Sequence, residues 1–193
     1  MPSRRHATPI YLLALALLAA CDDPGSSSTA GTTTSADDPA CPDYLQFCVT
    51  AELRGSVTAE ATAGYNHRNI PCADWAAAGP ARILELPGML SAGDASITVA
   101  LTRIGAYTGP GTYELRLETM TGDPDAFPAI DAAGRFFTND AGSTTTVTIS
   151  ADGSGTVEAA ALSEHESVQM PTPDPNARVD FTLSWTCNPA VAG

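Results

Sequence analysis

The chain has 193 residues and a formal net charge of −13, with 22 acidic residues against 9 arginines and no lysine. Because both nucleic acid and anionic lipid are bound through a basic face, this composition argues against either partner. The phosphate-binding patterns G-x-G-x-x-G and G-x-x-x-x-G-K-[ST] and the nucleophile pattern G-x-S-x-G are also absent from the sequence, which argues against nucleotide use and a serine hydrolase.

The first residues have the pattern of an export signal. A short basic start at Arg4–His6 precedes an apolar run of 11 residues, Ile10–Ala20. A membrane-spanning helix needs about 20 apolar residues, so this run is too short to span a bilayer. A charged start, a short apolar middle and small residues before a cut predict a secretory signal peptide over residues 1–20.

The end of this run, Leu18-Ala19-Ala20-Cys21, resembles the lipobox of bacterial lipoproteins. The resemblance covers residues 1–21 and the tether that follows. It implies cleavage before Cys21 and lipidation of that cysteine with two or three acyl chains, which anchor a protein stably. The expected location is the cell envelope, with the outer membrane or cell surface favoured. Since Asp22 follows the cysteine, and an Asp there retains some lipoproteins in the inner membrane, the periplasmic face of that membrane is the alternative.

Residues 21–40 hold the lipidated cysteine and a segment rich in Ser, Thr, Gly and Asp, without a large apolar side chain. Such a segment cannot bury enough surface to offset the entropy of ordering it. The composition therefore predicts a flexible tether with a reach of roughly 25 Å.

Residues 41–193 form the expected folded domain, and four cysteines fall within it. An even number of cysteines in an exported domain predicts two disulfides, which can pair in three ways. Cys48 and Cys187 lie on the expected first and last strands, which are often neighbours. We therefore favour Cys48–Cys187 together with Cys41–Cys72.

Alternation of apolar and polar residues with period two dominates this domain and predicts strands with one buried and one wet face. It covers Val49–Ala59, Ser96–Ile104, Thr112–Thr119, Thr144–Ser150, Thr156–Leu162 and Arg178–Cys187. The turn at Asp152–Gly155 predicts a hairpin between the fourth and fifth of these segments. Only Cys72–Ala78 has the pattern of a short helix. The fold class predicted is all-β, an antiparallel β-sandwich of about seven to nine strands with disulfides; a small barrel is the alternative.

Gly105–Tyr113 reads G-x-Y-x-G-x-G-x-Y, a turn whose glycines connect two strands tightly. It resembles a turn of small uncharacterised bacterial lipoproteins, as does the Trp-Thr-Cys that ends the last strand, and the resemblance implies no activity. We expect the two tyrosines to pack at the sandwich edge or pin the loop. The alternative is an exposed platform of Tyr65, Trp75 and Tyr107 on which a sugar stacks.

Clustered carboxylates offer a calcium-binding hypothesis. Asp123, Asp125 and Asp131 fall within nine residues, although the spacing is not that of an EF-hand, and an acidic turn is the default interpretation. A glycosidase needs two acids roughly 5–10 Å apart. Glu114 and Glu118 share the wet face of one predicted strand, but four residues of strand separate them by roughly 14 Å.

The histidines give little support to a metal site. His165 lies between Glu164 and Glu166, and His67 lies in a polar loop. Neighbouring residues on a strand point to opposite faces, and no second histidine stands at a metal-binding spacing. We expect a solvated loop at His165 and no cofactor.

The sequence thus predicts a cell-envelope lipoprotein that acts as a binding module without catalytic activity. Its expected partners are the membrane, through the lipid anchor, and an envelope protein or glycan. The alternatives are a glycan-acting hydrolase, a metal-binding sandwich domain, and a purely structural envelope lipoprotein.

Overall fold

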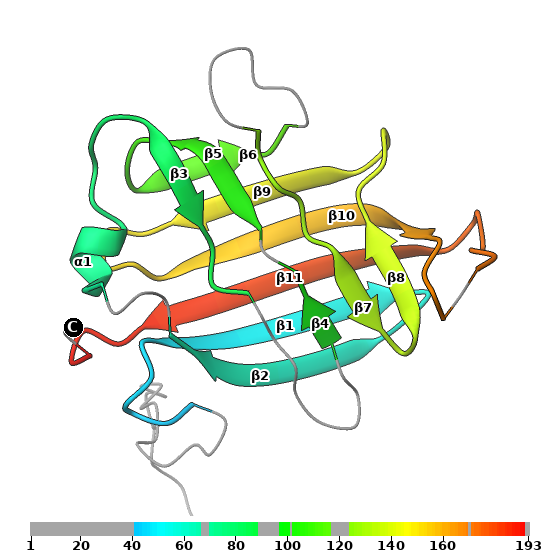
Figure 1. Cartoon of the computed structure of the whole chain (residues 1–193), viewed down its shortest axis with the longest axis horizontal. Coiled ribbons are helices and arrows are strands. Elements are labelled where there is room, and N and C mark those ends of the chain that lie inside the picture. Colours follow the sequence, from blue (N-terminus) through cyan, green and yellow to red (C-terminus); the bar gives the residue numbers. More distant parts are fainter. Residues whose placement is uncertain are drawn as a thin grey trace, which may run out of the picture. The chain divides into compact units, whose positions relative to one another are not determined.

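The computed structural model describes residues 41–66, 70–88, 97–100, 102–116, 124–169 and 171–191. Their strands form two layers, with long strands behind and shorter strands crossing in front (Figure 1). The predicted antiparallel β-sandwich is confirmed. The described residues contain 11 strands, nine of them in one sheet, which is more than the sequence predicted because the short front strands lack clear alternation.

Six antiparallel strands form the back layer in the spatial order β2-β1-β11-β10-β9-β6. They are β1 Phe47–Gly55, β2 Ala59–Tyr65, β6 Gly111–Glu114, β9 Thr144–Ile149, β10 Gly155–His165 and β11 Arg178–Cys187. The predicted hairpin is confirmed as the β9–β10 pair, which the tight turn at 150–154 connects.

The front layer holds the remaining strands, which are β3 Arg82–Glu85, β4 Ile97–Val99, β5 Arg103–Tyr107, β7 Ile130–Ala132 and β8 Arg135–Thr138. The helix α1, Cys72–Trp75, lies at one end of the sandwich (Figure 1). β3 and β5 form a separate two-stranded sheet. β8 pairs with the end of β10, and β7 and β4 follow it, so the large sheet continues from the back layer into the front one. β4, at one end of the large sheet, contacts β2 at the other end, so the sheet surrounds most of the core.

Alternation places the core as expected. In β11 every second side chain from Val179 to Trp185 is buried, and the intervening ones are exposed. Val147 and Ile149 in β9 and Val157 in β10 are buried in the same way. These apolar side chains stabilise the sandwich because folding removes them from water and buries them between the two layers.

Three predicted strands differ from the observed ones. The Val49–Ala59 segment is two strands, because the chain turns at Gly55, whose φ of 123° an L side chain rarely adopts. Ser96–Ile104 likewise divides into β4 and β5, and Thr102, expected in water, is buried. β6 ends at Glu114, and residues 117–119 of the predicted strand lie outside the described residues.

A β-bulge at Ala161 shifts the alternation of β10. Ala161 has φ of 56° and its N–H donates to the Asp180 carboxylate at 2.9 Å, while its carbonyl accepts from Ser143 at 2.9 Å. The extra residue turns Leu162 inward in place of the expected Ala161. Because the strand bends here, its last residues pair with β8 rather than with β9.

The predicted disulfide pairing is wrong. The bonds are Cys41–Cys48 and Cys72–Cys187, with Cα–Cα distances of 5.3 and 5.9 Å. Cys187 lies opposite Phe47 in the β1–β11 register, whereas Cys48 lies opposite Thr186. Cys48 and Cys187 therefore project from opposite faces of the sheet and cannot bond to each other.

Candidate binding surface on the outer sheet face

The outward side chains of the back layer align into a row of hydroxyl groups, which we call the hydroxyl row. Each member lies directly opposite the next in the pairing of neighbouring strands, so the row crosses all six strands. Its members are Thr62, Thr50, Ser184, Thr156, Thr148 and Thr112. Adjacent strands are about 4.8 Å apart, so the hydroxyls recur at about that spacing. Thr50 and Thr62 hydrogen-bond at 3.0 Å, and Thr112 and Thr148 at 3.2 Å.

A second row, one pleat away, carries carboxylates; we call it the carboxylate row. The same registers place Glu60, Glu52, Thr182, Glu158, Thr146 and Glu114 in line across the six strands. Arg54 pairs with Glu52 at 2.8 Å, and Arg116 pairs with Glu114 at 3.1 Å. Four acids against these two arginines leave the row with a net negative charge.

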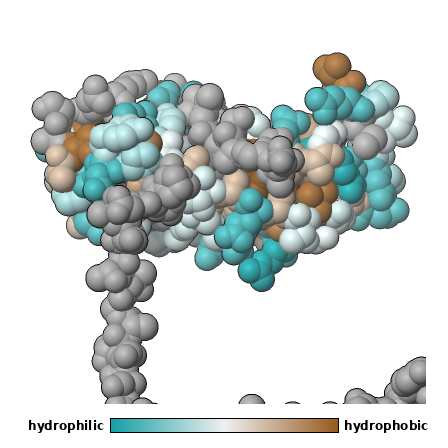
Figure 2. All heavy atoms as spheres, turned by 90° about the horizontal axis from the view of Figure 1, so that it is seen from below, coloured by the Kyte–Doolittle hydropathy of each residue, from teal (hydrophilic) through white to brown (hydrophobic). Residues whose placement is uncertain are grey.

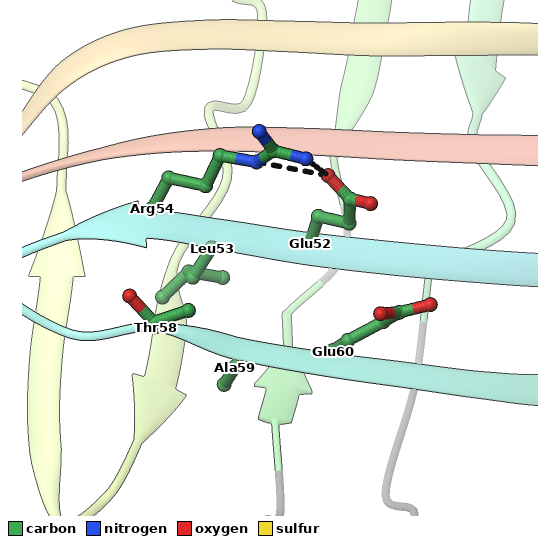
Figure 3. A pocket seen from close by; sticks show the side chains of 6 residues that line it. All are labelled: Glu52, Leu53, Arg54, Thr58, Ala59 and Glu60. Carbon is green, nitrogen blue, oxygen red and sulfur yellow. Dashed lines mark hydrogen bonds and ion pairs between the residues drawn. The ribbon is translucent and has the colours of Figure 1, made fainter. Parts of the chain in front are cut away.

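An open depression lies at one end of the carboxylate row, where β1 and β2 meet (Figure 3). Glu52 and Arg54 are joined above β1, and Glu60 extends from β2. Glu52 and Glu60 are opposite each other, so their Cβ atoms are about 5 Å apart. Of Glu114 and Glu118, which the sequence places too far apart for a glycosidase pair, Glu118 lies outside the described residues. Open to water and paired with arginine, this site offers hydrogen-bond acceptors rather than a closed catalytic cleft.

The alternative of an exposed aromatic platform is wrong. Tyr107 is 0% exposed and Trp75 is 2% exposed, and Tyr65 is half-buried against the core. Trp75 packs edge-on against Phe47 and Trp185, with ring centroids 5.2 and 6.3 Å apart. These rings are core residues because the helix and loops fold over the end of the sandwich. A view from below shows hydrophobic colour only in separate areas of the described surface (Figure 2).

The Gly105–Tyr113 turn is held by its own tyrosines, as the packing hypothesis expected. The Tyr107 hydroxyl donates to the Ala76 carbonyl at 2.7 Å, and burial raises the pKa of this tyrosine. The Tyr113 hydroxyl donates to the Gly109 carbonyl at 2.5 Å, and the two rings lie 5.4 Å apart. Both tyrosine hydroxyls are thus engaged by backbone carbonyls inside the protein and are not presented to a ligand.

The calcium candidates do not gather into a site in the described residues. Both carboxylate oxygens of Asp125 accept backbone N–H groups, from Gly105 at 2.7 Å and Arg116 at 2.8 Å. Asp131 is an exposed residue of β7, and Asp123 lies outside the described residues. No group of three or more His, Cys, Asp or Glu side chains able to hold a metal occurs in the described part of the chain.

Glu164 and His165 are the last residues of β10 and Glu166 follows the strand, so the expectation of a solvated loop at His165 is wrong. His165 Nε2 lies 3.1 Å from Ser163 Oγ, while His67 lies outside the described residues. Glu164 points the other way, and its side chain is 1% exposed. Arg135 donates to it at 2.5 and 2.9 Å, and the Asp174 N–H donates at 3.1 Å. Chiefly through the hydrogen bond from Arg135, the pKa of Glu164 is lowered, and this buried pair joins β8 to β10.

Sequence reasoning missed the two polar rows. A signal was present, because threonine or serine occupies alternate positions at 144–148 and 182–186. The missing information was the strand register, which decides whether hydroxyls of different strands align.

Comparison with known proteins finds no matching family model, no matching curated protein and no matching solved structure. Among the described residues, no helix is both long and apolar enough to cross a bilayer. Cys21 lies outside the described residues. The outer face of the sheet is therefore the feature on which a functional proposal depends.

Proposed function

We propose that this chain is a lipid-anchored protein of the bacterial cell envelope that binds a partner through the outer face of its large sheet and has no catalytic activity. The anchor rests on the Leu18–Cys21 lipobox resemblance. The two disulfides support an exported location, since such bonds persist in oxidising compartments. The outer membrane or cell surface is the favoured location.

The observation that carries the binding role is the alignment of the hydroxyl row with the carboxylate row. The two rows present hydrogen-bonding groups on six neighbouring strands without a gap. A rigid sheet holds such groups in fixed positions, so less entropy is lost on binding. The net negative charge favours an uncharged or cationic partner over a polyanion.

The anchor is tested by labelling cells with a palmitate analogue. The wild-type chain is expected to incorporate label and partition with membranes, and the Cys21→Ser chain to do neither. Protease treatment of intact and lysed cells then locates the domain. Cleavage on intact cells supports surface display, and cleavage only after lysis places the domain in the periplasm. Absence of label from the wild-type chain would overturn the lipid anchor.

The binding face is tested with a bulky charged substitution at its centre. Ser184→Arg lies in the hydroxyl row, and Thr98→Arg, exposed on β4 of the front layer, is the matched control. Purified envelope fractions are passed over each immobilised protein. We expect Ser184→Arg to lose bound material that the wild type and Thr98→Arg retain. Equal retention by all three would show that this face binds nothing.

A further inference from the structure

We propose that the hydroxyl row binds an extended, uncharged polysaccharide of hexose units that lies across the six strands. This inference rests on the proposed binding role of the outer sheet face and specifies the ligand class. It follows from the length and period of the row, from the chemistry of its groups and from the charge beside it.

The length and period of the hydroxyl row suit a polymer. Six strands at about 4.8 Å give a row about 24 Å long. A ligand that runs across the strands meets one hydroxyl side chain per strand, from Thr62 at one edge to Thr112 at the other. One hexose unit of an extended polymer is about as long as the spacing between strands, so each sugar unit lies over one hydroxyl side chain.

The chemistry of the rows matches sugar hydroxyls. A Ser or Thr hydroxyl both donates and accepts, as a sugar hydroxyl does. The carboxylate row adds strong acceptors one pleat away, and Glu60 and Glu158 are exposed there. A ligand over the hydroxyl row therefore reaches acceptors along one flank.

Charge and polarity argue against other partners. The negative carboxylate row repels phosphate-bearing and uronic polymers. The outward side chains in the two rows are Thr, Ser and Glu, so an apolar protein surface finds no hydrophobic counterpart there. A cationic protein segment satisfies the charge but has no reason to follow a row of hydroxyls, and it is the competing outcome of the test.

Affinity should depend on ligand length, because each neutral hydrogen bond to an exposed group contributes little. Many such bonds act together only when one ligand spans several strands. Oligomers shorter than the row should therefore bind much more weakly than oligomers that cross it.

The test uses the purified full chain, with its disulfides intact, in a detergent without sugar groups. Calorimetric titration with β-1,4-linked glucose and N-acetylglucosamine oligomers compares a dimer, a tetramer and a hexamer. We expect affinity to rise up to the hexamer with at least one of the two sugars, and to stay constant as salt is raised, since these probes carry no charge.

Near-isosteric substitutions then locate the binding. Thr156→Val and Ser184→Ala are each expected to weaken hexamer binding about 2- to 10-fold, the loss of one hydrogen bond. Thr98→Val on β4 is the control and is expected to bind as the wild type does. Thermal melting of each variant confirms that it is folded, and loss of binding in all three variants alike would overturn the assignment to the row.

The outcomes separate this inference from the proposed function. If neither sugar binds but Ser184→Arg still abolishes salt-sensitive capture of envelope protein, the polysaccharide is wrong and the face binds a cationic protein. If neither sugar binds and Ser184→Arg changes nothing, both proposals are wrong.

Discussion

Removing the Cys72–Cys187 disulfide is expected to destabilise the protein about twice as much as removing Cys41–Cys48. The two bonds close chain segments of very different length, with sequence separations of 115 and 7 residues. A cross-link restricts the unfolded chain more when its loop is longer. The chain-entropy relation gives about 4.8 kcal/mol for the long loop and about 2.4 kcal/mol for the short one at 25 °C.

Contacts in the folded state should not reduce this difference between the stabilities contributed by the two disulfides. The short Cys41–Cys48 loop is also held by hydrogen bonds from Asn188, whose backbone N–H donates to Gln46 at 2.7 Å and whose side chain donates to the Asp43 carbonyl at 2.8 Å. These bonds survive loss of the cystine, so little native structure should change.

The Cys72–Cys187 disulfide is more tightly packed by its neighbours. A Cβ on Gly153 would approach Cys187 Cβ to 3.3 Å, and the Trp185 indole donates to the Gly153 carbonyl at 2.8 Å. Loss of sulfur contacts there adds to the entropic effect.

The assay is urea unfolding of the two double variants, Cys72→Ser/Cys187→Ser and Cys41→Ser/Cys48→Ser, monitored by tryptophan fluorescence. Replacing both partners avoids a free thiol. The slope of each transition must be fitted separately, because removing a cross-link expands the unfolded chain. Equal losses in the two variants, or a larger loss in the short-loop variant, would refute the loop-length argument.

Two further polar contacts make testable contributions to stability. Tyr107→Phe should cost about 1–3 kcal/mol because it leaves the buried Ala76 carbonyl without its donor, whereas Tyr44→Phe, at a 73% exposed residue, should leave the denaturation midpoint unchanged. Arg135→Ala should cost about 3–5 kcal/mol because Glu164 stays buried without its cation; the exposed pair Arg116–Glu114 provides the control, and Arg116→Ala should change the midpoint little. Because folding lowers the pKa of Glu164, its stabilisation is fully present above the ordinary value of 4.5 and is lost as pH falls towards the folded pKa. Melting temperatures measured down through that range should therefore fall less steeply for Glu164→Gln than for the wild type, and parallel curves would contradict the ion-pair role.

Local pattern predicted the fold well where one face of a strand is buried. β11 was bounded correctly as Arg178–Cys187, with its buried and exposed sides correct, and the β9–β10 hairpin follows from the turn between two alternating segments. Short strands such as β3, β7 and β8 were missed. They have three or four residues, which is too few for a period of two to stand out.

The errors concern information that spans distant parts of the chain. The disulfide pairing failed because strand adjacency was predicted but register was not, and a one-residue difference puts a side chain on the other face. The aromatic platform failed because nothing local indicates that α1 folds over the core and buries Trp75. The bulge at Ala161 depends on the side chain of Asp180 from the neighbouring strand.

The proposal of a binding surface rests on how the fold uses its polar groups. Several polar groups are bonded to a specific partner inside the protein, namely the Tyr113 hydroxyl, the Asp125 carboxylate and the Arg135–Glu164 pair. Replacing any of them should lower the free energy of unfolding. The outward hydroxyls of β11 have no comparable role, because the sheet's backbone hydrogen bonds and its buried side chains hold that strand in place. Replacing Ser184 with Ala should therefore leave stability nearly unchanged while it weakens ligand binding. A substitution that weakens binding without changing the free energy of unfolding identifies a recognition surface. On a surface that only keeps the protein soluble, the same substitution would change neither quantity.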